Sequence, residues 1–415
     1  MEDTKQFILP IKKSSDFFDV IRKLITAKEA QNNNAPFFVM NMRLITIVVK
    51  NWYSKMPNIE PFYPIRCNSD HVFLKLLTHN GEMGLCCSNR EEAEIVPNLI
   101  SVDRIIYHNP LWTRGNIRHA RECGIKTFIV ESEDDLRRFT TFYPDANIIL
   151  RVVMDQKLIS DPLTADNFNV ERAAHLLSKT ENSSLNISVR SNGPSPTMYS
   201  YAIAQCRRLF DIGSEFGHKF CILDLGEQFP SITATSGLSF DQVADSVRVS
   251  LSLLFPSKLF KHVKIIARPG TYFAASSCSF VTRIIGKQVV DSSILTNYGN
   301  CCSNADSTAY IYQINEGFYG AFGCKLLTHC DPTCSPLIDD GGKLDTFAAI
   351  VGPDPCHNDV VLPLTRLPVL QVNDWLIWHD MGAYTMGNCS TLNGENIPLP
   401  TIHYYWESDT TTFVF

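Results

Sequence analysis

Cysteine is the residue type whose abundance first suggests metal or redox chemistry, because the chain has 14 cysteines among 415 residues. A structural zinc site needs thiolates in pairs that are separated by about two residues. Here the cysteines are adjacent or irregularly spaced, as in Cys86-Cys87, Cys301-Cys302, Cys324, Cys330 and Cys334. We therefore expect reduced, mostly buried cysteines and no metal site.

The elements that could position a catalytic site are short apolar, β-branched runs that alternate with helical patterns between about residues 60 and 270. Such alternation is typical of parallel βαβ units. Eight runs can be counted: Pro61–Asn68, Glu82–Ser88, Asp103–Asn109, Lys126–Val130, Asn147–Val153, Leu185–Ser191, Phe220–Gly226 and Val263–Pro269. They predict a (β/α)8 TIM barrel, in which catalytic residues lie at the C-terminal ends of the strands.

The pattern changes after Arg268 to strands and turns without intervening helices, which predicts an antiparallel β domain. The apolar run Ala35–Met40 follows a polar loop, and we expect it to add a strand to that domain. The predicted fold class is therefore α/β with three parts. These are an N-terminal segment (1–40) that contributes to the β domain, the barrel (41–275) and the C-terminal β domain (276–415).

Charge and hydropathy exclude several kinds of partner. The chain has 37 basic and 43 acidic residues, a net charge of -6, and no long block of either sign, which argues against nucleic-acid binding. No run approaches the roughly 18 apolar residues of a membrane span. The first residues lack the basic flank and apolar core of a signal peptide, so we expect a cytoplasmic protein with no membrane association.

Six collinear segments resemble eukaryotic ornithine decarboxylase and its non-catalytic relative, antizyme inhibitor. The segments are PFYPIRCN (61–68), LDLGEQFP (223–230), ARPGTYFAAS (267–276), NEGFYGAF (315–322), VGPDPC (351–356) and NDWLIWHDMGAYT (373–385). This family of group IV decarboxylases has the alanine-racemase-like fold. The resemblance implies a barrel that binds pyridoxal phosphate (PLP) and a C-terminal β domain.

The resemblance also shows which catalytic positions differ. The family lysine that forms the Schiff base with PLP corresponds to Arg66, whose guanidinium stays protonated and cannot act as the neutral amine nucleophile. The family glutamate that holds the proton on the pyridine nitrogen corresponds to Arg268, a like charge that would disfavour pyridinium. A family aspartate near the cofactor corresponds to Cys86, and the histidine that stacks on the ring corresponds to Arg190.

The implied phosphate contacts are altered as well. The family's glycine triplet, whose N–H groups hold the phosphate, reads Gly226-Glu227-Gln228, and its phosphate-binding arginine reads Thr271. Only Arg151 and Tyr384 match the cofactor contacts of the family. With no catalytic position intact, we expect no cofactor in this chain, although active members of the family use PLP.

The substrate side of the resemblance is mixed. Glu316 replaces a family aspartate that binds the distal amine. Cys356 and His357 correspond to the Cys-Asp pair that reaches into the partner subunit's active site in the family, with one extra residue, Asp354 or Pro355, before them. We therefore expect a monomer or a weak dimer.

The family offers a second function, the binding of antizyme, on barrel helices that follow the third and fourth strands. The corresponding region holds a mixed-charge surface that we expect to be centred on a buried leucine: Arg114, Arg118, Arg121, Lys126, Asp135 and Leu136. Charge complementarity of this kind sets specificity and capture rate. An acidic helix start is also favoured by the helix dipole alone, and surface charge is normal on barrel helices.

The sequence thus predicts an inactive decarboxylase homologue that regulates polyamine (putrescine) synthesis, with antizyme as the expected partner. Two alternatives stay open. One is a regulatory subunit of an active ornithine decarboxylase, and the other is a divergent decarboxylase of the same pathway.

Overall fold

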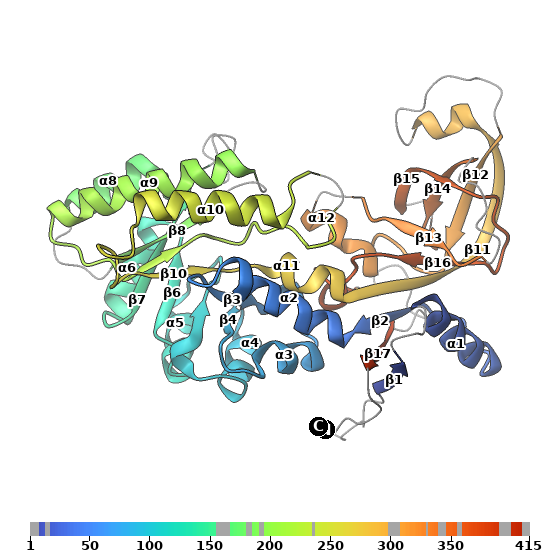
Figure 1. The fold of residues 1–415 in the computed structure, drawn as a ribbon, viewed down its shortest axis with the longest axis horizontal. Coiled ribbons are helices and arrows are strands. Elements are labelled where there is room, and N and C mark those ends of the chain that lie inside the picture. Colours follow the sequence, from blue (N-terminus) through green and yellow to red (C-terminus); the bar gives the residue numbers. More distant parts are fainter. Residues whose placement is uncertain are drawn as a thin grey trace. The chain divides into compact units, whose positions relative to one another are not determined.

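The computed structural model describes residues 8–12, 17–154, 167–179, 185–190, 195–234, 237–297, 308–328, 331–338, 346–354, 359–389 and 400–408. The chain separates into two compact units, each described by itself (Figure 1). One unit is Thr46–Phe273, and the other combines Met1–Ile45 with Ala274–Phe415. The boundaries predicted from the sequence, after residues 40 and 275, differ from these divisions by a few residues.

The first unit is a closed barrel of eight parallel strands in the order β10-β3-β4-β5-β6-β7-β8-β9, which confirms the predicted (β/α)8 architecture. Each strand overlaps the run predicted for it. The strands are β3 (Glu60–Pro64), β4 (Gly84–Cys87), β5 (Ile105–Tyr107), β6 (Thr127–Val130), β7 (Asn147–Val153), β8 (Leu185–Arg190), β9 (Ile222–Asp224) and β10 (Lys264–Ala267).

The strands are apolar almost throughout because both of their faces are covered. Their inward side chains form one buried cluster that fills the barrel, made of Phe62, Cys86, Ile106, Ile129, Ile149 and Ile266. The barrel is therefore a packed core, and polar chemistry is confined to the ends of its strands.

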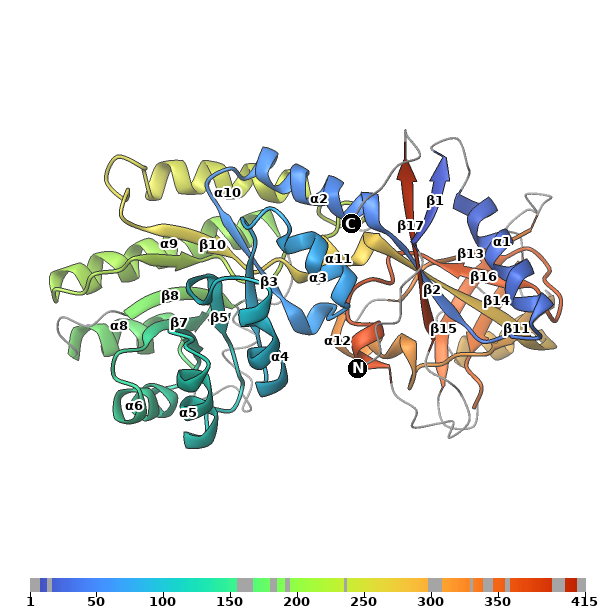
Figure 2. The same cartoon turned by 90° about the horizontal axis from the view of Figure 1, so that it is seen from below.

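The helices of the chain up to the end of the barrel alternate with these strands, and α9 packs between α8 and α10 (Figures 1 and 2). N-cap residues define the start of several of these helices. The side chains of Asn89, Thr113 and Ser132 each accept a hydrogen bond from a backbone N–H of the first turn. The helices are α2 (Met42–Lys55), α3 (His71–Thr78), α4 (Arg90–Ile95), α5 (Arg114–Glu122), α6 (Glu133–Phe142), α8 (Val170–Lys179), α9 (Pro196–Glu215), α10 (Phe240–Leu254) and α11 (Gly270–Ala274).

The second unit is built on a sheet with the order β1-β17-β2-β11-β12-β14-β15, to which β16 and β13 are added at β11. Most neighbours are antiparallel, as predicted, but β1–β17, β17–β2 and β12–β14 are parallel pairs. The strands are β1 (Ile8–Lys12), β2 (Phe37–Asn41), β11 (Cys278–Asp291), β12 (Thr308–Ile314), β13 (Cys334–Pro336), β14 (Thr346–Val351), β15 (Val360–Leu367), β16 (Trp375–Trp378) and β17 (Thr401–Ser408).

The N-terminal segment contributes to this unit, which confirms that prediction. Strand β2 lies between β11 and β17, and helix α1 (Phe17–Ala30) buries one apolar side against the sheet. A short helix, α12 (Cys324–Thr328), lies between β12 and β13 in the chain.

The part of the chain that the structure describes contains no helix long and apolar enough to cross a membrane. It also contains no group of three His, Cys, Asp or Glu side chains placed to hold a metal ion.

Candidate functional site

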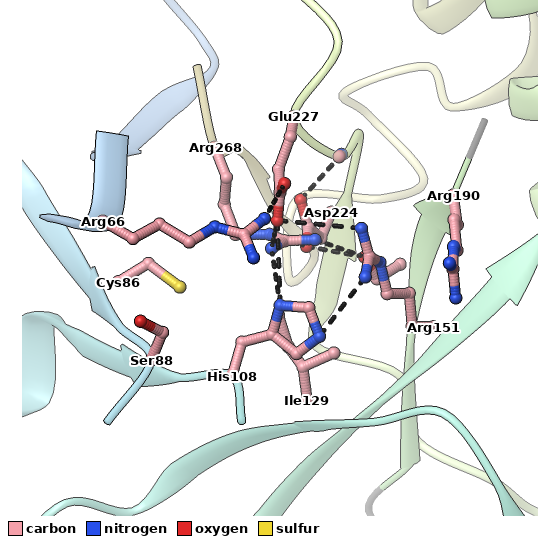
Figure 3. Close-up of polar contacts among 12 residues, drawn as sticks. Arg66, Cys86, Ser88, His108, Ile129, Arg151, Arg190, Asp224, Glu227 and Arg268 are labelled. Carbon is pink, nitrogen blue, oxygen red and sulfur yellow. Dashed lines mark hydrogen bonds and ion pairs between the residues drawn. The ribbon is translucent and has the colours of Figure 1, made fainter. Parts of the chain in front are cut away.

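The C-terminal ends of the barrel strands carry a connected group of charged side chains (Figure 3), which we call the mouth network. It consists of four arginines, three carboxylates and one histidine: Arg66, Arg151, Arg190, Arg268, Glu131, Asp224, Glu227 and His108. Each lies within a strand near its end or within a few residues after it, so closure of the barrel brings all of them together. This is the position at which barrel enzymes carry their chemistry.

Arg268 and Asp224 form the buried base of the mouth network. Arg268 Nε donates to Asp224 Oδ2 at 2.7 Å, and both side chains are fully buried. The hydroxyl of Ser188 donates to the same oxygen at 2.7 Å, and the backbone N–H of Gly226 donates to Oδ1 at 2.8 Å. Burial alone would lower the pKa of Arg268, but the charges of Asp224 and Glu227 outweigh it and raise the pKa above its ordinary value. Arg268 is therefore a permanent cation.

Glu227 places its carboxylate among the cations of the mouth network, as Figure 3 shows. Oε2 accepts a hydrogen bond from Arg66 Nη2 at 2.7 Å, and Oε1 accepts one from Arg268 Nη1. Oε1 also lies 3.8 Å from Arg151 Nη2 and 3.7 Å from His108 Nδ1. Burial alone would raise the pKa of Glu227, but Arg268 and Arg151 outweigh it and hold the pKa well below its ordinary value. The carboxylate is thus ionised.

Glu131 has a similar position on the other side of His108. It accepts hydrogen bonds from Arg151 Nη1 at 2.7 Å and Arg190 Nη1 at 2.8 Å, and its Oε1 lies 2.8 Å from His108 Nε2. Burial would raise the pKa of Glu131, but the His108 hydrogen bond and the arginine charges outweigh it and lower the pKa. His108 therefore lies between two ionised carboxylates.

Cys86 carries no charge at its position. Its side chain is buried, and this burial raises the pKa of the thiol to about 12 even though Arg268 acts in the opposite direction. A neutral thiol therefore stands where the resemblance implies a carboxylate near the cofactor. The same strand end thus supplies an apolar contact and no counter-ion for the surrounding arginines.

The turn after β9 is held in one conformation by Gly226. Its φ is +82°, and an added Cβ would lie 2.5 Å from the backbone oxygen of Val189. The backbone oxygen of the following Gln228 accepts the hydroxyl of Tyr199. Thr271, the third altered residue of the implied phosphate site, lies in α11 and is partly buried.

The remaining cofactor and substrate positions lie outside the barrel unit. Glu316 and Tyr384 belong to the β unit, where Glu316 is buried and accepts the N–H of Gly317 at 2.8 Å. Burial raises the pKa of Glu316. Cys356 and His357 lie outside the described residues.

The predicted partner surface lies on α5, on α6 and at Lys126, which directly precedes β6. Arg114, Arg118, Arg121 and Lys126 are all exposed. The expectation of a buried leucine at the centre is wrong, because Leu136 is only partly buried and the neighbouring Asp135 is the buried side chain, with Arg138 Nη1 3.0 Å from its Oδ1. Asp135 follows the cap residue of α6 by three positions, and its backbone N–H donates to the Ser132 hydroxyl.

Three members of the mouth network were not identified from the sequence: His108, Glu131 and Asp224. A signal for them exists, since His108 and Glu131 directly follow strands β5 and β6 and Asp224 is the last residue of β9. Polar residues at the ends of barrel strands are candidates by position alone.

Comparison with known proteins places this geometry in a family. Residues 42–275 match the family model described as "Pyridoxal-dependent decarboxylase, pyridoxal binding domain". The chain is 31% identical to an ornithine decarboxylase of Caenorhabditis elegans, over 98% of this chain and 96% of that protein. It is 29% identical to antizyme inhibitor 2 of Xenopus laevis, over 91% of this chain and 82% of that protein.

Solved structures share the fold at lower identity. The arginine decarboxylase of Paramecium bursaria Chlorella virus, bound to agmatine, has a TM-score of 0.77 at 24% identity and covers 94% of this chain and 100% of that chain. SrLDC in complex with PLP and cadaverine has a TM-score of 0.74 at 21% identity and covers 97% of this chain and 95% of that chain.

These findings overturn the expectation of a protein without a cofactor. The matched domain is a pyridoxal binding domain, so the barrel belongs to a family that depends on pyridoxal phosphate. In the described residues, Arg151, which the resemblance implies as a cofactor contact, has an Nε that is buried without a hydrogen-bond partner. Arg66 does not fit covalent attachment, because its guanidinium is paired with Glu227 at 2.7 Å. No step is therefore assigned to the cofactor.

The family match spans the whole mouth network, and the relative from Caenorhabditis elegans is similar over nearly the entire chain. The barrel and the β unit agree with the fold of the decarboxylase structures. The chain is an ornithine-decarboxylase-like protein and belongs to the family of pyridoxal-dependent decarboxylases.

Proposed function

We propose that this protein does not decarboxylate ornithine and that it regulates polyamine synthesis by binding antizyme. The observation that carries the proposal is the ion pair between Arg66 and Glu227. It lies where the resemblance implies a lysine amine beside a glycine loop. The proposal concerns activity and partner binding, and binding of pyridoxal phosphate is a separate property.

Two independent features support the loss of activity. Arg66 cannot supply a neutral amine nucleophile, because a guanidinium remains protonated at any physiological pH. Arg268 is a buried, permanent cation at the position where the resemblance implies the acid that protonates the pyridine nitrogen. A like charge at that position opposes formation of pyridinium. Each feature acts on a different requirement of decarboxylation, so repair of one leaves the other in place.

The exposed arginines of α5 support the partner role. Arg114, Arg118 and Arg121 follow one another at helical spacing, and we call these three residues the α5 arginine face. Two of them lie over aromatic rings at the end of α6: Arg114 over Phe142 at 5.4 Å and Arg121 over Tyr143 at 5.3 Å. Such stacking fixes the direction of a guanidinium while its N–H groups remain exposed. The α5 arginine face suits an acidic partner surface.

Activity is tested by release of carbon dioxide from labelled ornithine by the purified protein with added pyridoxal phosphate. We expect no release above a blank, while a catalytic ornithine decarboxylase measured in parallel gives full turnover. An absorbance spectrum of the same sample reports whether an internal Schiff base forms. Sustained turnover of ornithine would refute the proposed inactivity.

Antizyme binding is tested by titration of purified antizyme. The charge reversal Arg114→Glu/Arg118→Glu/Arg121→Glu is expected to weaken binding at least about tenfold and to reduce its salt dependence. The matched control, Lys258→Glu/Lys261→Glu, reverses exposed charges after α10 and is expected to bind as the unchanged protein does. Equal affinity of all three proteins would exclude the α5 arginine face, and no binding by the unchanged protein would exclude antizyme.

A second candidate function is a divergent decarboxylase, which is favoured by the 31% and 32% identity to two nematode ornithine decarboxylases. A panel of basic amino acids in the same carbon dioxide assay separates it from the first candidate. Release from any of them supports the second candidate.

A further inference from the structure

The two most exposed large apolar side chains in the described part of the chain lie close together in the sequence. Leu253, in the last turn of α10, is 74% exposed, and Leu259, in the turn between α10 and β10, is 72% exposed. Phe216, at the end of α9, is exposed as well. Single exposed apolar side chains are common in soluble proteins, but a group of them often marks a contact surface.

These side chains lie at one end of the barrel. Helices α9 and α10 pack side by side (Figures 1 and 2), and the strands that follow them, β9 and β10, are paired. The helices of a (β/α)8 barrel run opposite to its strands, so the ends of α9 and α10 lie away from the mouth network. The two helix-to-strand connections, 216–221 and 255–263, meet where the N–H of Lys264 donates to the oxygen of Cys221 at 2.7 Å.

The turn that carries Leu259 is anchored beneath its tip. The N–H groups of Leu259 and Phe260 both donate to the oxygen of Pro256. The ring of Phe260 packs against Phe255 with 5.1 Å between the centroids, and the guanidinium of Arg207 in α9 lies 4.3 Å from the Phe260 centroid. Phe260 is thus held against α9, while Leu259 beside it projects into solvent.

Three exposed lysines flank these apolar side chains: Lys219 in the first connection, and Lys258 and Lys261 in the second. Within the residues that the structure describes, none of the three forms an ion pair. The two connections contain no acidic residue, and Glu215, which precedes the first of them, offsets one of the three charges. This surface is therefore basic, although the whole chain has a net charge of -6. The expectation of no membrane association came from that total and from the absence of a spanning segment, and neither describes a local surface.

An anionic lipid surface fits this combination better than a protein partner does. A helix or peptide docks into a groove that surrounds its apolar side chains. Leu253 and Leu259 instead project outward, and Leu259 does so from the tip of a turn. Apolar side chains placed in this way can enter the boundary between headgroups and acyl chains of a bilayer, and adjacent lysines are attracted to anionic headgroups. The long lysine stems let their ammonium groups stay at that boundary.

We propose that this surface binds a membrane that contains anionic phospholipids. We call its five residues the α10 tip: Leu253, Leu259, Lys219, Lys258 and Lys261. The two leucines insert, and the three lysines lie among the headgroups. Because so few apolar side chains insert, binding is reversible and requires anionic lipid. The inference goes beyond the proposed function and does not depend on it, because the α10 tip and the α5 arginine face share no residue.

The test is co-sedimentation of the full chain with lipid vesicles. Vesicles of phosphatidylcholine with about 30% phosphatidylserine are compared with vesicles of phosphatidylcholine alone. We expect binding to the first kind only, and we expect it to weaken at least about tenfold as sodium chloride rises from about 0.05 M to about 0.5 M, because salt screens the lysines. Absence of binding to both kinds at low salt overturns the proposal, and so does equal binding to both.

Two variants separate attraction by charge from insertion. Lys258→Glu/Lys261→Glu should bind the anionic vesicles at least about tenfold more weakly, because two attractive charges become repulsive. Leu253→Ser/Leu259→Ser keeps the lysines and should bind at least about threefold more weakly, because it removes the inserted apolar area. An unchanged affinity in either variant overturns the proposal.

The matched control is Lys23→Glu/Lys50→Glu, which changes the net charge equally at exposed positions of α1 and α2. It should bind within about twofold of the unchanged protein, because charges farther away than the screening length contribute little. A loss as large as that of Lys258→Glu/Lys261→Glu would mean that total charge decides binding, and it would overturn the α10 tip. Antizyme titration of Lys258→Glu/Lys261→Glu should be unchanged, so failure of this proposal is distinct from failure of the proposed function.

Insertion is measured directly with Leu259→Trp. Anionic vesicles should shift the emission of the added indole to the blue, relative to the unchanged protein with its five tryptophans. If Leu259→Trp does not fold, Leu253→Trp replaces it. Vesicle binding without a blue shift overturns the proposal. Binding of soluble polyglutamate together with no vesicle binding would assign the lysines to an acidic protein and would likewise overturn it.

Discussion

Arg268 and Asp224 are joined at 2.7 Å between Nε and Oδ2 with neither side chain exposed to solvent. Removing two charges from water is costly, and only close geometry with additional hydrogen bonds compensates for that cost. Here the additional bonds come from Ser188 and the backbone of Gly226. The pair is therefore intolerant of the loss of one partner.

Replacement of one member of this pair should strongly destabilise the fold. Arg268→Met leaves Asp224 as a buried, uncompensated charge, and we expect a loss of about 3 to 5 kcal/mol in the free energy of unfolding. The double variant Asp224→Asn/Arg268→Met should recover part of that loss. Urea denaturation measures both. Asp245→Asn, in an exposed pair, should change stability by less than about 1 kcal/mol. A similarly small effect of Arg268→Met would contradict the prediction.

Stability should fall with acid partly through Glu131. Its pKa in the folded protein is below the ordinary value of 4.5, so the ionised form favours folding. This contribution is fully present above pH 4.5 and is lost as the pH falls toward the folded-state pKa. Glu131→Gln should thus be less stable than the unchanged protein at pH 7, and the difference should shrink below pH 4.5 in thermal unfolding experiments. A difference that stays constant from pH 7 to pH 3 would argue against this prediction.

Arg66→Lys alone should restore no decarboxylation. The new amine would still face the Glu227 carboxylate, and the buried cation at Arg268 would remain. Carbon dioxide release from ornithine with added pyridoxal phosphate is the measurement, and an absorbance spectrum shows whether the lysine has reacted. The triple variant Arg66→Lys/Glu227→Gly/Arg268→Glu is the comparison, because it carries at all three positions the residue that the family pattern implies. Turnover by the single variant would mean that the other two changes are harmless.

Gly226→Ala should destabilise the barrel more than Gly237→Ala. Both glycines have positive φ, +82° and +88°, so both variants incur the cost of about 1 to 2 kcal/mol for a left-handed residue. Only at Gly226 does the added Cβ meet backbone, at 2.5 Å from the oxygen of Val189, whereas nothing lies within 4 Å at Gly237. Urea denaturation of the two variants isolates the clash. Equal losses would show that the turn can move away from β8.

The barrel could be predicted from the sequence because each strand is a short apolar run buried on both faces, and such runs are visible without knowledge of their neighbours. Sequence also identified Arg66, Glu227 and Arg268 as departures from the family pattern. It did not predict that these residues are partners of one another. Arg66 and Glu227 are 161 positions apart, and their contact depends on which strand ends become neighbours when the barrel closes.

The same limit applies to charge. Sequence identified Glu227 only as an altered residue of the implied phosphate loop, and the fold shows that its carboxylate is the anion among the guanidinium groups. The resemblance placed Asp135 on the expected partner surface, whereas its side chain is buried in the fold. For both Glu227 and Asp135 the sequence gives the charge of the residue, but it does not give the side chains that surround it in the fold.

The sheet of the β unit joins strands from early and late parts of the chain, since β2 pairs with both β11 and β17. Phe37 is aligned with Thr401 across β2 and β17, so this pairing waits until synthesis has passed residue 401. The barrel, in contrast, is one continuous segment and can form on the ribosome before the β unit. Apolar side chains of α1 and β2 must therefore remain without their sheet while the barrel is being translated, and they are exposed to wrong contacts during that time.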